Sequence, residues 1–496
     1  MNKTILFVLA YSLLSGCTAF QPKIPLTDVE INPHLARLAS CEQFYLSLDR
    51  FSRSENIQDS QTKAIPGTLF LNVDRFWHSF KPELDTLEKK DFWIFQTAKL
   101  NQKARMVQWH NLSESAKSTV RKKHLRSTSA NQRIQSCSQE HLKQLTLADK
   151  NRVINLADTH DDYSLTMRSL GIYPLSSLIV TRQIKKHLQS TRKTFNTPLH
   201  RLPIKHKLQR YTPNKFRFSD NYSVERENPL NVPFLSTTTL DQLFNQFAPV
   251  LEVDEANNSD KIGQVFLDQN GKPAVDIHHP VIYTLPSYTR FNDKVYLQLN
   301  YFFWFPERPK EKSFDIYAGK FDGIIWRVTL DENLSPILFD TVHNCGCYHK
   351  LYATDKLKFK LEEASIEKEP PFLAQNKLTY ENQKPWVLRI NSVNHFVERI
   401  YQDNKFDKNA KSYDVKSYHD LRQLTQLGKP TGKSRSFFNN KGIVSESKRP
   451  ERFILWPMGV PSAGAMRQWG HHAIAFVGRR YFDEPFLLDK YFMFSD

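Results

Sequence analysis

Glycine is scarce in this chain, which has 15 glycines among 496 residues. Only Gly16, Gly67 and Gly171 precede residue 250, and we find neither a nucleotide-binding glycine loop nor an internal repeat. After residue 16 no apolar run approaches the roughly 20 residues that a membrane-spanning helix needs. The chain is 40% hydrophobic and 12% aromatic, which excludes intrinsic disorder. We therefore expect a soluble folded body of two or three domains.

The N-terminus, MNKTILFVLAYSLLSGC, combines one lysine, a short apolar stretch and small residues before Cys17. This pattern is typical of a cleaved secretory signal. Leu14-Ser15-Gly16-Cys17 also resembles the lipobox of bacterial lipoproteins. The resemblance implies a signal peptide over residues 1–16 and a lipid such as palmitate on the sulfur of Cys17. Because Thr18 stands where an inner-membrane retention signal would place Asp, it also implies sorting to the outer membrane. The alternative is an ordinary secretory signal with a chance cysteine.

A lipid anchor at Cys17 would place the protein in the cell envelope, facing the periplasm or the cell surface. Four further cysteines would then lie in an oxidising compartment, which favours disulfide bonds. We expect Cys41 to pair with Cys137, and Cys345 and Cys347 to form a separate local unit. The alternative for the first pair is two free buried thiols.

Long stretches without glycine predict helices in the first half of the chain. Leu84 to Trp109 is one such stretch, and Gln139 to Leu156 is another, with apolar residues at mostly helical spacing. We therefore predict an α-rich N-terminal domain over residues 17–181.

The second half shows runs of β-branched and aromatic residues separated by turn signals. We predict strands over residues 294–305, 323–330, 337–343 and 473–477. No helical crossover fits between these strands, so hairpins and a mainly antiparallel sheet are expected. The fold class is thus α+β, with a β-rich, sandwich-like C-terminal domain over residues 236–496.

The order of segments between residues 247 and 350 resembles that of the vacuolar-sorting-associated and necrosis-inducing families. Those proteins are β-sandwiches in which a cluster around Gly-His-x-x-Asp-Trp-Glu binds a divalent cation. This chain offers Asp322-Gly323 and Trp326-Arg327, with no Glu after the tryptophan and no His before the aspartate. The resemblance therefore implies a β-sandwich and carries no function across.

Positive charge is concentrated between the two halves. The chain has a net charge of +17, and the stretch from Arg182 to Arg217 holds eleven Lys/Arg and no Asp or Glu. Pro198, Pro203 and Pro213 interrupt any helix there. We predict a basic, proline-containing linker over residues 182–235 that meets anionic lipid or lipopolysaccharide phosphate. Nucleic acid is the weaker partner, and a solvated extended segment without a partner is the alternative.

The string DTVHNCGCYH suggests a metal site. His343, Cys345, Cys347 and His349 alternate, so an extended strand places all four on one face, and a bend at Gly346 would let two or three reach one ion. Zinc is the metal expected, with a further ligand from one of these pairs: His278 and His279, or His471 and His472. We take His472 as that ligand. Two alternatives stay open: a Cys345–Cys347 disulfide, and a cysteine nucleophile activated by a neighbouring histidine.

Asp322 and Arg327 are the catalytic candidates upstream of that string. A carboxylate at a strand entrance can act as a general base, whereas the alternative for Asp322-Gly323 is a simple turn. Arg327 alternates with apolar neighbours, so it faces solvent or a polar cleft.

Two functions follow from these features. The first is an outer-membrane lipoprotein that performs metal-assisted hydrolysis, in which Asp322 accepts a proton from metal-bound water. The second is a non-catalytic binding or scaffold lipoprotein that contacts anionic envelope components through its basic segment. Whether the protein is an enzyme stays open at this point.

Overall fold

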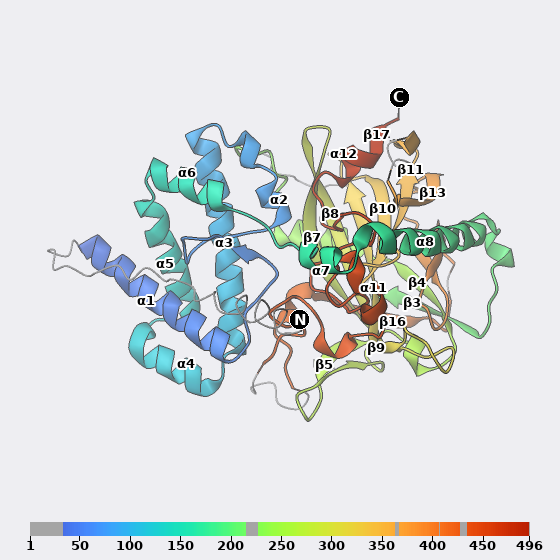
Figure 1. Ribbon diagram of the computed structural model, residues 1–496, viewed down its shortest axis with the longest axis horizontal. Helices are drawn as coiled ribbons and strands as arrows, with labels where there is room; N and C mark the ends of the chain where they lie inside the picture. Colours follow the sequence, from blue (N-terminus) through green and yellow to red (C-terminus); the bar gives the residue numbers. More distant parts are fainter. Residues whose placement is uncertain (1–32, 215–226, 363–366, 406, 427–433, 496) are drawn as a thin grey trace, which may run out of the picture.

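A computed structural model describes the protein over residues 33–214, 227–362, 367–405, 407–426 and 434–495. Helices dominate the N-terminal part of the chain, and one large sheet dominates the C-terminal part (Figure 1). The predicted α+β class is therefore confirmed. Cys17 and the signal-like segment before it lie outside the described residues.

The α-helices vary from one turn to 25 residues. They are α1 (Pro33–Ser54), α2 (Arg75–His78), α3 (Leu87–Asn111), α4 (Glu114–Val120), α5 (Ala130–Gln144), α6 (Leu147–Leu156), α7 (Leu165–Leu170), α8 (Tyr173–Asn196), α9 (Thr237–Gln246), α11 (Arg452–Leu455) and α12 (Leu487–Tyr491). Short 3-10 turns include η4 (Asn258–Asp260) and η7 (Trp456–Met458).

The strands are β1 (Lys63–Ala64), β2 (Asn72–Val73), β3 (Lys207–Pro213), β4 (Val250–Glu255), β5 (Gln264–Leu267), β6 (Pro273–Asp276), β7 (Val281–Phe291), β8 (Lys294–Arg308), β9 (Gly319–Leu330), β10 (Pro336–His343), β11 (Lys350–Thr354), β12 (Leu357–Phe359), β13 (Phe372–Leu378), β14 (Trp386–Ile390), β15 (Val397–Gln402), β16 (Lys411–Ser417) and β17 (Phe492–Phe494). Eleven of them form one sheet in the order β13-β11-β10-β9-β8-β7-β16-β3-β4-β14-β15.

The centre of this sheet is the antiparallel run that the sequence predicts. The strands expected over residues 294–305, 323–330 and 337–343 lie within β8, β9 and β10, which pair with one another in order. Their alternating side chains face a core on each side of the sheet.

The outer strands make the sheet mixed and curved. Strand β16 pairs parallel with both β7 and β3, β4 pairs parallel with β14, and β11 pairs parallel with β13. The curvature brings the two edge strands near each other, and the side chain of Gln375 in β13 bonds the backbone N–H and C=O of Ile400 in β15 at 2.9 and 3.0 Å. The result is a half-barrel with Trp326, Phe339 and Trp386 in its interior. The sandwich-like arrangement is therefore wrong, since one sheet curls on itself where two were expected to stack.

The segment at residues 473–477 is not a strand. Ala473 makes only an isolated bridge with Tyr481, and the segment packs as irregular chain against the outer face of the half-barrel. Its apolar side chains are explained by burial in that position, which a short apolar run does not distinguish from a strand.

The N-terminal helices enclose a core of their own. Helix α3 contains most of the predicted 84–109 helix and begins at the side-chain cap of Thr86. Cys41 in α1 and Cys137 in α5 form a disulfide with a Cα–Cα distance of 5.3 Å. The predicted pairing is therefore confirmed, and it joins two helices that pack in one hydrophobic cluster.

The helix expected over residues 139–156 is divided between α5 and α6. The break falls at Leu145 and Thr146, because Thr146 and Asp149 form a reciprocal capping box that begins a new helix. That signal is present in the sequence and outweighs the continuous helical spacing.

The basic segment is structured where a linker was expected. Residues from Arg182 to Asn196 form the second half of helix α8, which ends just before Pro198, and Lys207–Pro213 is strand β3 inside the sheet. Residues 215–226 of the segment lie outside the described residues. Helix α8 runs along the half-barrel and contacts both β13 and β15, so it covers the seam where the sheet closes (Figure 1).

Candidate functional site

The predicted site residues divide between the two faces of the sheet. Asp322 and His343 lie on the inner face at one end of the half-barrel, and His343 Nδ1 is 3.6 Å from Asp322 Oδ1. Arg327 lies on the outer face, because it is five positions after Asp322 on β9 and side chains alternate along a strand; His349 lies there too, beside Asp340. The two predicted catalytic residues, Asp322 and Arg327, are thus separated by the sheet.

Asp322 is fully buried and its carboxylate is shared by basic neighbours. His395 Nδ1 lies 2.8 Å from Oδ2, Arg449 Nη2 donates to Oδ1 at 3.3 Å, and His395 Nε2 lies 3.2 Å from Asp260. Burial opposes ionisation, but Arg449, His343 and His395 hold the pKa of Asp322 well below its usual range. The same carboxylates raise the pKa of His395 against its burial. Asp322 is therefore an ion-pair centre and is poorly suited to accept a proton from a bound water.

Arg327 and His349 converge on another buried carboxylate. Arg327 Nε donates to Asp340 Oδ1 at 2.9 Å, and its Nη1 donates to the carbonyl of Phe482 at 2.6 Å. His349 Nε2 lies 3.0 Å from Asp340 Oδ2. Arg327 therefore faces neither solvent nor a cleft, since the C-terminal segment covers it.

The two cysteines of the predicted metal site are buried free thiols. The backbone N–H of Cys347 points to Cys345 Sγ at 3.4 Å, across a turn in which Gly346 has a φ of 91°. A hydrogen bond to Cys345 and burial raise the pKa of the Cys347 thiol, which favours the protonated form over a nucleophilic thiolate. The Cys345–Cys347 disulfide is not formed in the structure.

The ring of His472 packs against Trp469 and Phe482. Burial and the charge of Arg467 lower the pKa of His472 to about 3. Within the described ranges, no three or more His, Cys, Asp or Glu side chains are placed to hold one metal ion. His343, Cys345, Cys347, His349 and His472 are all described, so the predicted set does not come together.

Four basic side chains do come together, around the ring of Phe396. Arg308 Cζ lies 5.9 Å and Lys350 Nζ 5.3 Å from the ring centroid, and the imidazoles of His343 and His187 lie 5.5 and 5.6 Å from it. We call this set the basic centre. It is assembled from the end of β8, the start of β11, the end of β10 and helix α8, with Phe396 in the turn between β14 and β15.

Carboxylates act on the two cations of the basic centre only at longer range, Asp322 on Arg308 and Glu398 on Lys350. Arg308 and Lys350 are 5% and 4% exposed, and neither has a carboxylate within 4 Å among the described residues. His343 Nδ1 faces Asp322 at 3.6 Å, and its Nε2 lacks a hydrogen-bond partner within the described structure. Burial and the charges of Lys350 and Arg308 lower the pKa of His343 and of His187 to about 4, and burial lowers that of Lys350 to about 8.

Sequence reasoning found only His343 of this centre. His187, Arg308 and Lys350 are distant in sequence, and the curvature of the sheet and the placement of α8 bring them to one ring. The only local signals are the Tyr-His-Lys string at residues 348–350 and the position of His187 within the basic segment.

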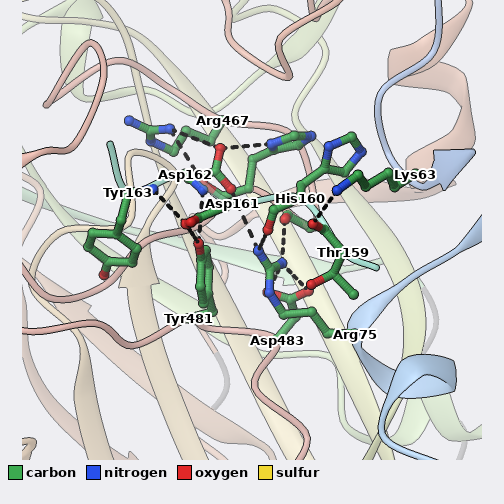
Figure 2. A network of polar contacts seen from close by, with 12 residues as sticks. Lys63, Arg75, Thr159, His160, Asp161, Asp162, Tyr163, Arg467, Tyr481 and Asp483 are labelled. Atoms are coloured by element: carbon green, nitrogen blue, oxygen red, sulfur yellow. Dashed lines mark hydrogen bonds and ion pairs between the residues drawn. The ribbon is translucent and has the colours of Figure 1, made fainter. Parts of the chain in front are cut away.

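A second polar network joins the helical part to the C-terminal segment (Figure 2). Arg75 of α2 donates to the carbonyl of Gly470 at 2.6 Å and pairs with Asp483 at 3.0 Å. His471 Nδ1 lies 2.9 Å from Asp162, and its Nε2 lies 2.7 Å from the carbonyl of Ser60. These contacts hold distant segments together, and His471 is committed to them.

The other unusual feature is a solvent-facing apolar surface where α7, α8 and α11 meet. We call it the apolar patch; its members and exposed fractions are Leu165 69%, Leu170 72%, Ile172 60%, Leu175 64%, Leu178 61%, Ile179 70%, Phe453 68%, Ile454 56% and Trp456 36%. The parts are adjacent, because a Cβ at Gly171 would lie 2.4 Å from Pro457. Exposed apolar clusters of this kind mark interaction surfaces.

The same outward face of α8 becomes basic further along the helix. Leu175, Leu178 and Ile179 are followed at helical spacing by exposed basic side chains, which we call the basic row: Arg182, Lys185, Lys186, Arg192 and Lys193. The opposite face of α8 carries Phe195 and His187 toward the half-barrel.

The buried carboxyl group of Glu451 is expected to make the stability of the protein depend on pH. It is 4% exposed, and burial raises its pKa to about 7. A folded-state pKa above the unfolded one adds stability at low pH, which is lost as pH rises from about 4.5 to above 7. We expect Glu451→Gln to unfold at nearly the wild-type free energy at pH 5 and to be about 2 kcal/mol more stable than wild type at pH 8. Urea unfolding at both pH values checks this, and a difference that does not change with pH contradicts it.

Comparison of the chain with protein-family models, with curated proteins and with solved structures gives no match. Among the described residues, no helix has both the length and the apolar character needed to cross a membrane.

Proposed function

We propose that the protein is an outer-membrane lipoprotein of the bacterial envelope that binds an anionic membrane surface through helix α8, without catalysing a reaction there. The observation that carries the proposal is the outward face of α8, which is apolar from Leu175 to Ile179 and basic from Arg182 to Lys193. A surface-lying helix combines these features: its apolar side chains enter the boundary of the bilayer, and its cations meet anionic headgroups.

The charge around α8 favours a lipid surface over a protein partner. The segment from Arg182 to Arg217 has no acidic residue, so no carboxylate within this segment can pair with the basic row. Large aromatic side chains at the rim, Phe453 and Trp456, are of the type that sits at the membrane interface. A lipid at Cys17 would supply a second attachment, and stable anchoring commonly takes two.

The hydrolase alternative has less support. Its proposed base, Asp322, is engaged by Arg449 and His395, and the predicted metal ligands are dispersed. The binding function requires only the exposed surface of α8.

The first test removes positive charge from α8 in the unlipidated chain, residues 17–496 with Cys17→Ser. R182Q/K185Q/K186Q is expected to weaken binding to phosphatidylglycerol vesicles on the order of 30-fold at low ionic strength, because each cation near an anionic surface contributes about 1 kcal/mol before screening. Sedimentation with vesicles measures this affinity.

The matched control is R121Q/K122Q/K123Q, which removes one arginine and two lysines from the exposed side of the helical domain. It should bind vesicles as wild type does. Equal binding by the α8 variant and wild type at low salt would contradict the proposed function.

A further inference from the structure

We infer that the basic centre beneath α8 binds a phosphate group. If the phosphate belongs to a lipid headgroup, the inference rests on the proposed function. If it belongs to a free phosphate ester, the inference is independent of that function.

The first argument is charge. Arg308 and Lys350 are buried within 6 Å of the ring of Phe396, and no ion pair within 4 Å joins either of them to a carboxylate in the described chain; Asp322 and Glu398 act on them from farther away. Asp322, the nearest acidic group to His343, already serves Arg449 and His395. Burying a charge is costly unless it is paired, so an anion between these side chains would stabilise them.

The second argument is unused hydrogen-bonding capacity. His343 is 2% exposed; its Nδ1 faces Asp322 Oδ1 at 3.6 Å, and its Nε2 has no hydrogen-bond partner among the described residues. Nε of Arg308 is also without a partner there, although another guanidinium nitrogen donates to Asn394. Buried polar atoms are nearly always satisfied, so Nε2 of His343, donating while Nδ1 accepts or carries no proton, and the N–H at Arg308 Nε point to a ligand that accepts hydrogen bonds.

The third argument is the number and spread of the donors. A guanidinium, an ammonium and two imidazoles approach from four elements of the fold. A carboxylate offers two oxygens in one plane, whereas a phosphate offers three or more around a tetrahedral centre. The spread of these donors therefore matches phosphate better.

The centre reaches the surface at its aromatic side chains. Tyr348, Phe396 and His187, whose rings contact one another, are partly exposed. His187 is eight residues along α8 from Ile179, about 12 Å at 1.5 Å per residue. Because His187 lies on the face of α8 opposite the apolar patch, a headgroup phosphate would reach the centre around the side of the helix.

The test uses the unlipidated chain with three probes: inorganic phosphate, glycerol 3-phosphate and phosphatidylglycerol vesicles. Calorimetry and ³¹P NMR measure the soluble probes, and sedimentation measures the vesicles. We expect Lys350→Gln to weaken binding of at least one probe tenfold or more, with Lys350→Arg retaining it because the charge remains. Lys310→Gln, which removes an exposed lysine just after β8, should bind as wild type.

The outcomes distinguish a lipid headgroup from a free phosphate ester, and they test the phosphate site separately from the membrane function. Tenfold weaker binding of the soluble probes by K350Q supports a free phosphate ester, and an effect confined to vesicles supports a lipid headgroup. If wild type binds neither soluble probe and K350Q binds vesicles normally, the inference is overturned while the membrane function stands. If soluble phosphate binds through Lys350 and vesicles do not bind, the membrane function fails and the phosphate site stands. Far-ultraviolet circular dichroism of K350Q and K350R shows whether each variant is folded.

Discussion

Replacement of Leu178 and Ile179 by asparagine is expected to weaken vesicle binding by the unlipidated chain roughly 100-fold. The two side chains are 61% and 70% exposed in the folded protein and would leave water on docking. Full burial of a Leu or Ile contributes about 1.5–3 kcal/mol, so losing two largely exposed ones should cost about 3 kcal/mol of binding free energy. Sedimentation with phosphatidylglycerol vesicles measures the change.

The stability of this variant should hardly change, because neither side chain is packed in a core and substitutions at such surface positions usually alter the free energy of unfolding little. The matched control is L87N/L147N, since Leu87 and Leu147 are 54% and 53% exposed on the helical domain. If the control loses vesicle affinity as much as the α8 variant does, the apolar patch has no special role.

Loss of the Cys41–Cys137 disulfide is expected to lower the free energy of unfolding of the helical domain by about 4 kcal/mol. The bridge spans 96 residues, and a cross-link over such a loop removes much of the conformational freedom of the unfolded chain. Urea unfolding of C41S/C137S, followed by circular dichroism, measures the effect. C345S/C347S is the control, because those thiols are free, and it should respond to reductant as wild type does. An unchanged urea midpoint in C41S/C137S would contradict this.

Local sequence patterns predicted those helices and strands whose own residues show which faces are buried. The alternation in residues 294–305 identifies β8 because both faces of that strand are buried, and the long glycine-free stretch identifies α3. The position of Cys41 and Cys137 in the N-terminal half was sufficient to predict their disulfide bond. In each case the information lies within the segment or in a single pairing.

Helix α8 and the parallel strands were missed because their signals depend on tertiary contacts. Clustered lysines and prolines between Arg182 and Arg217 indicated a linker, yet the apolar side chains that hold α8, such as Phe195, are few and pack against the half-barrel. Strands β4 and β14 are more than a hundred residues apart, and no local pattern states that they pair in parallel.

The candidate site was predicted only in part for the same reason. Placing His343 close to Asp322 needs only the neighbouring strands β9 and β10, whereas placing His187 and Lys350 at one ring needs the curvature of the whole sheet. The strand period of two also explains why Arg327, five residues after Asp322, lies on the other face.

The most direct test of the membrane function is the depth of position 178 in a bilayer. In L178W, bound to vesicles of phosphatidylglycerol with brominated acyl chains, we expect tryptophan emission to shift to the blue and to be quenched beyond the background of the eight native tryptophans, because the side chain should lie about 5–10 Å into the boundary of the acyl region. L147W, on the helical domain, should show neither change. Emission from L178W that stays unshifted and unquenched in the presence of vesicles would contradict the account.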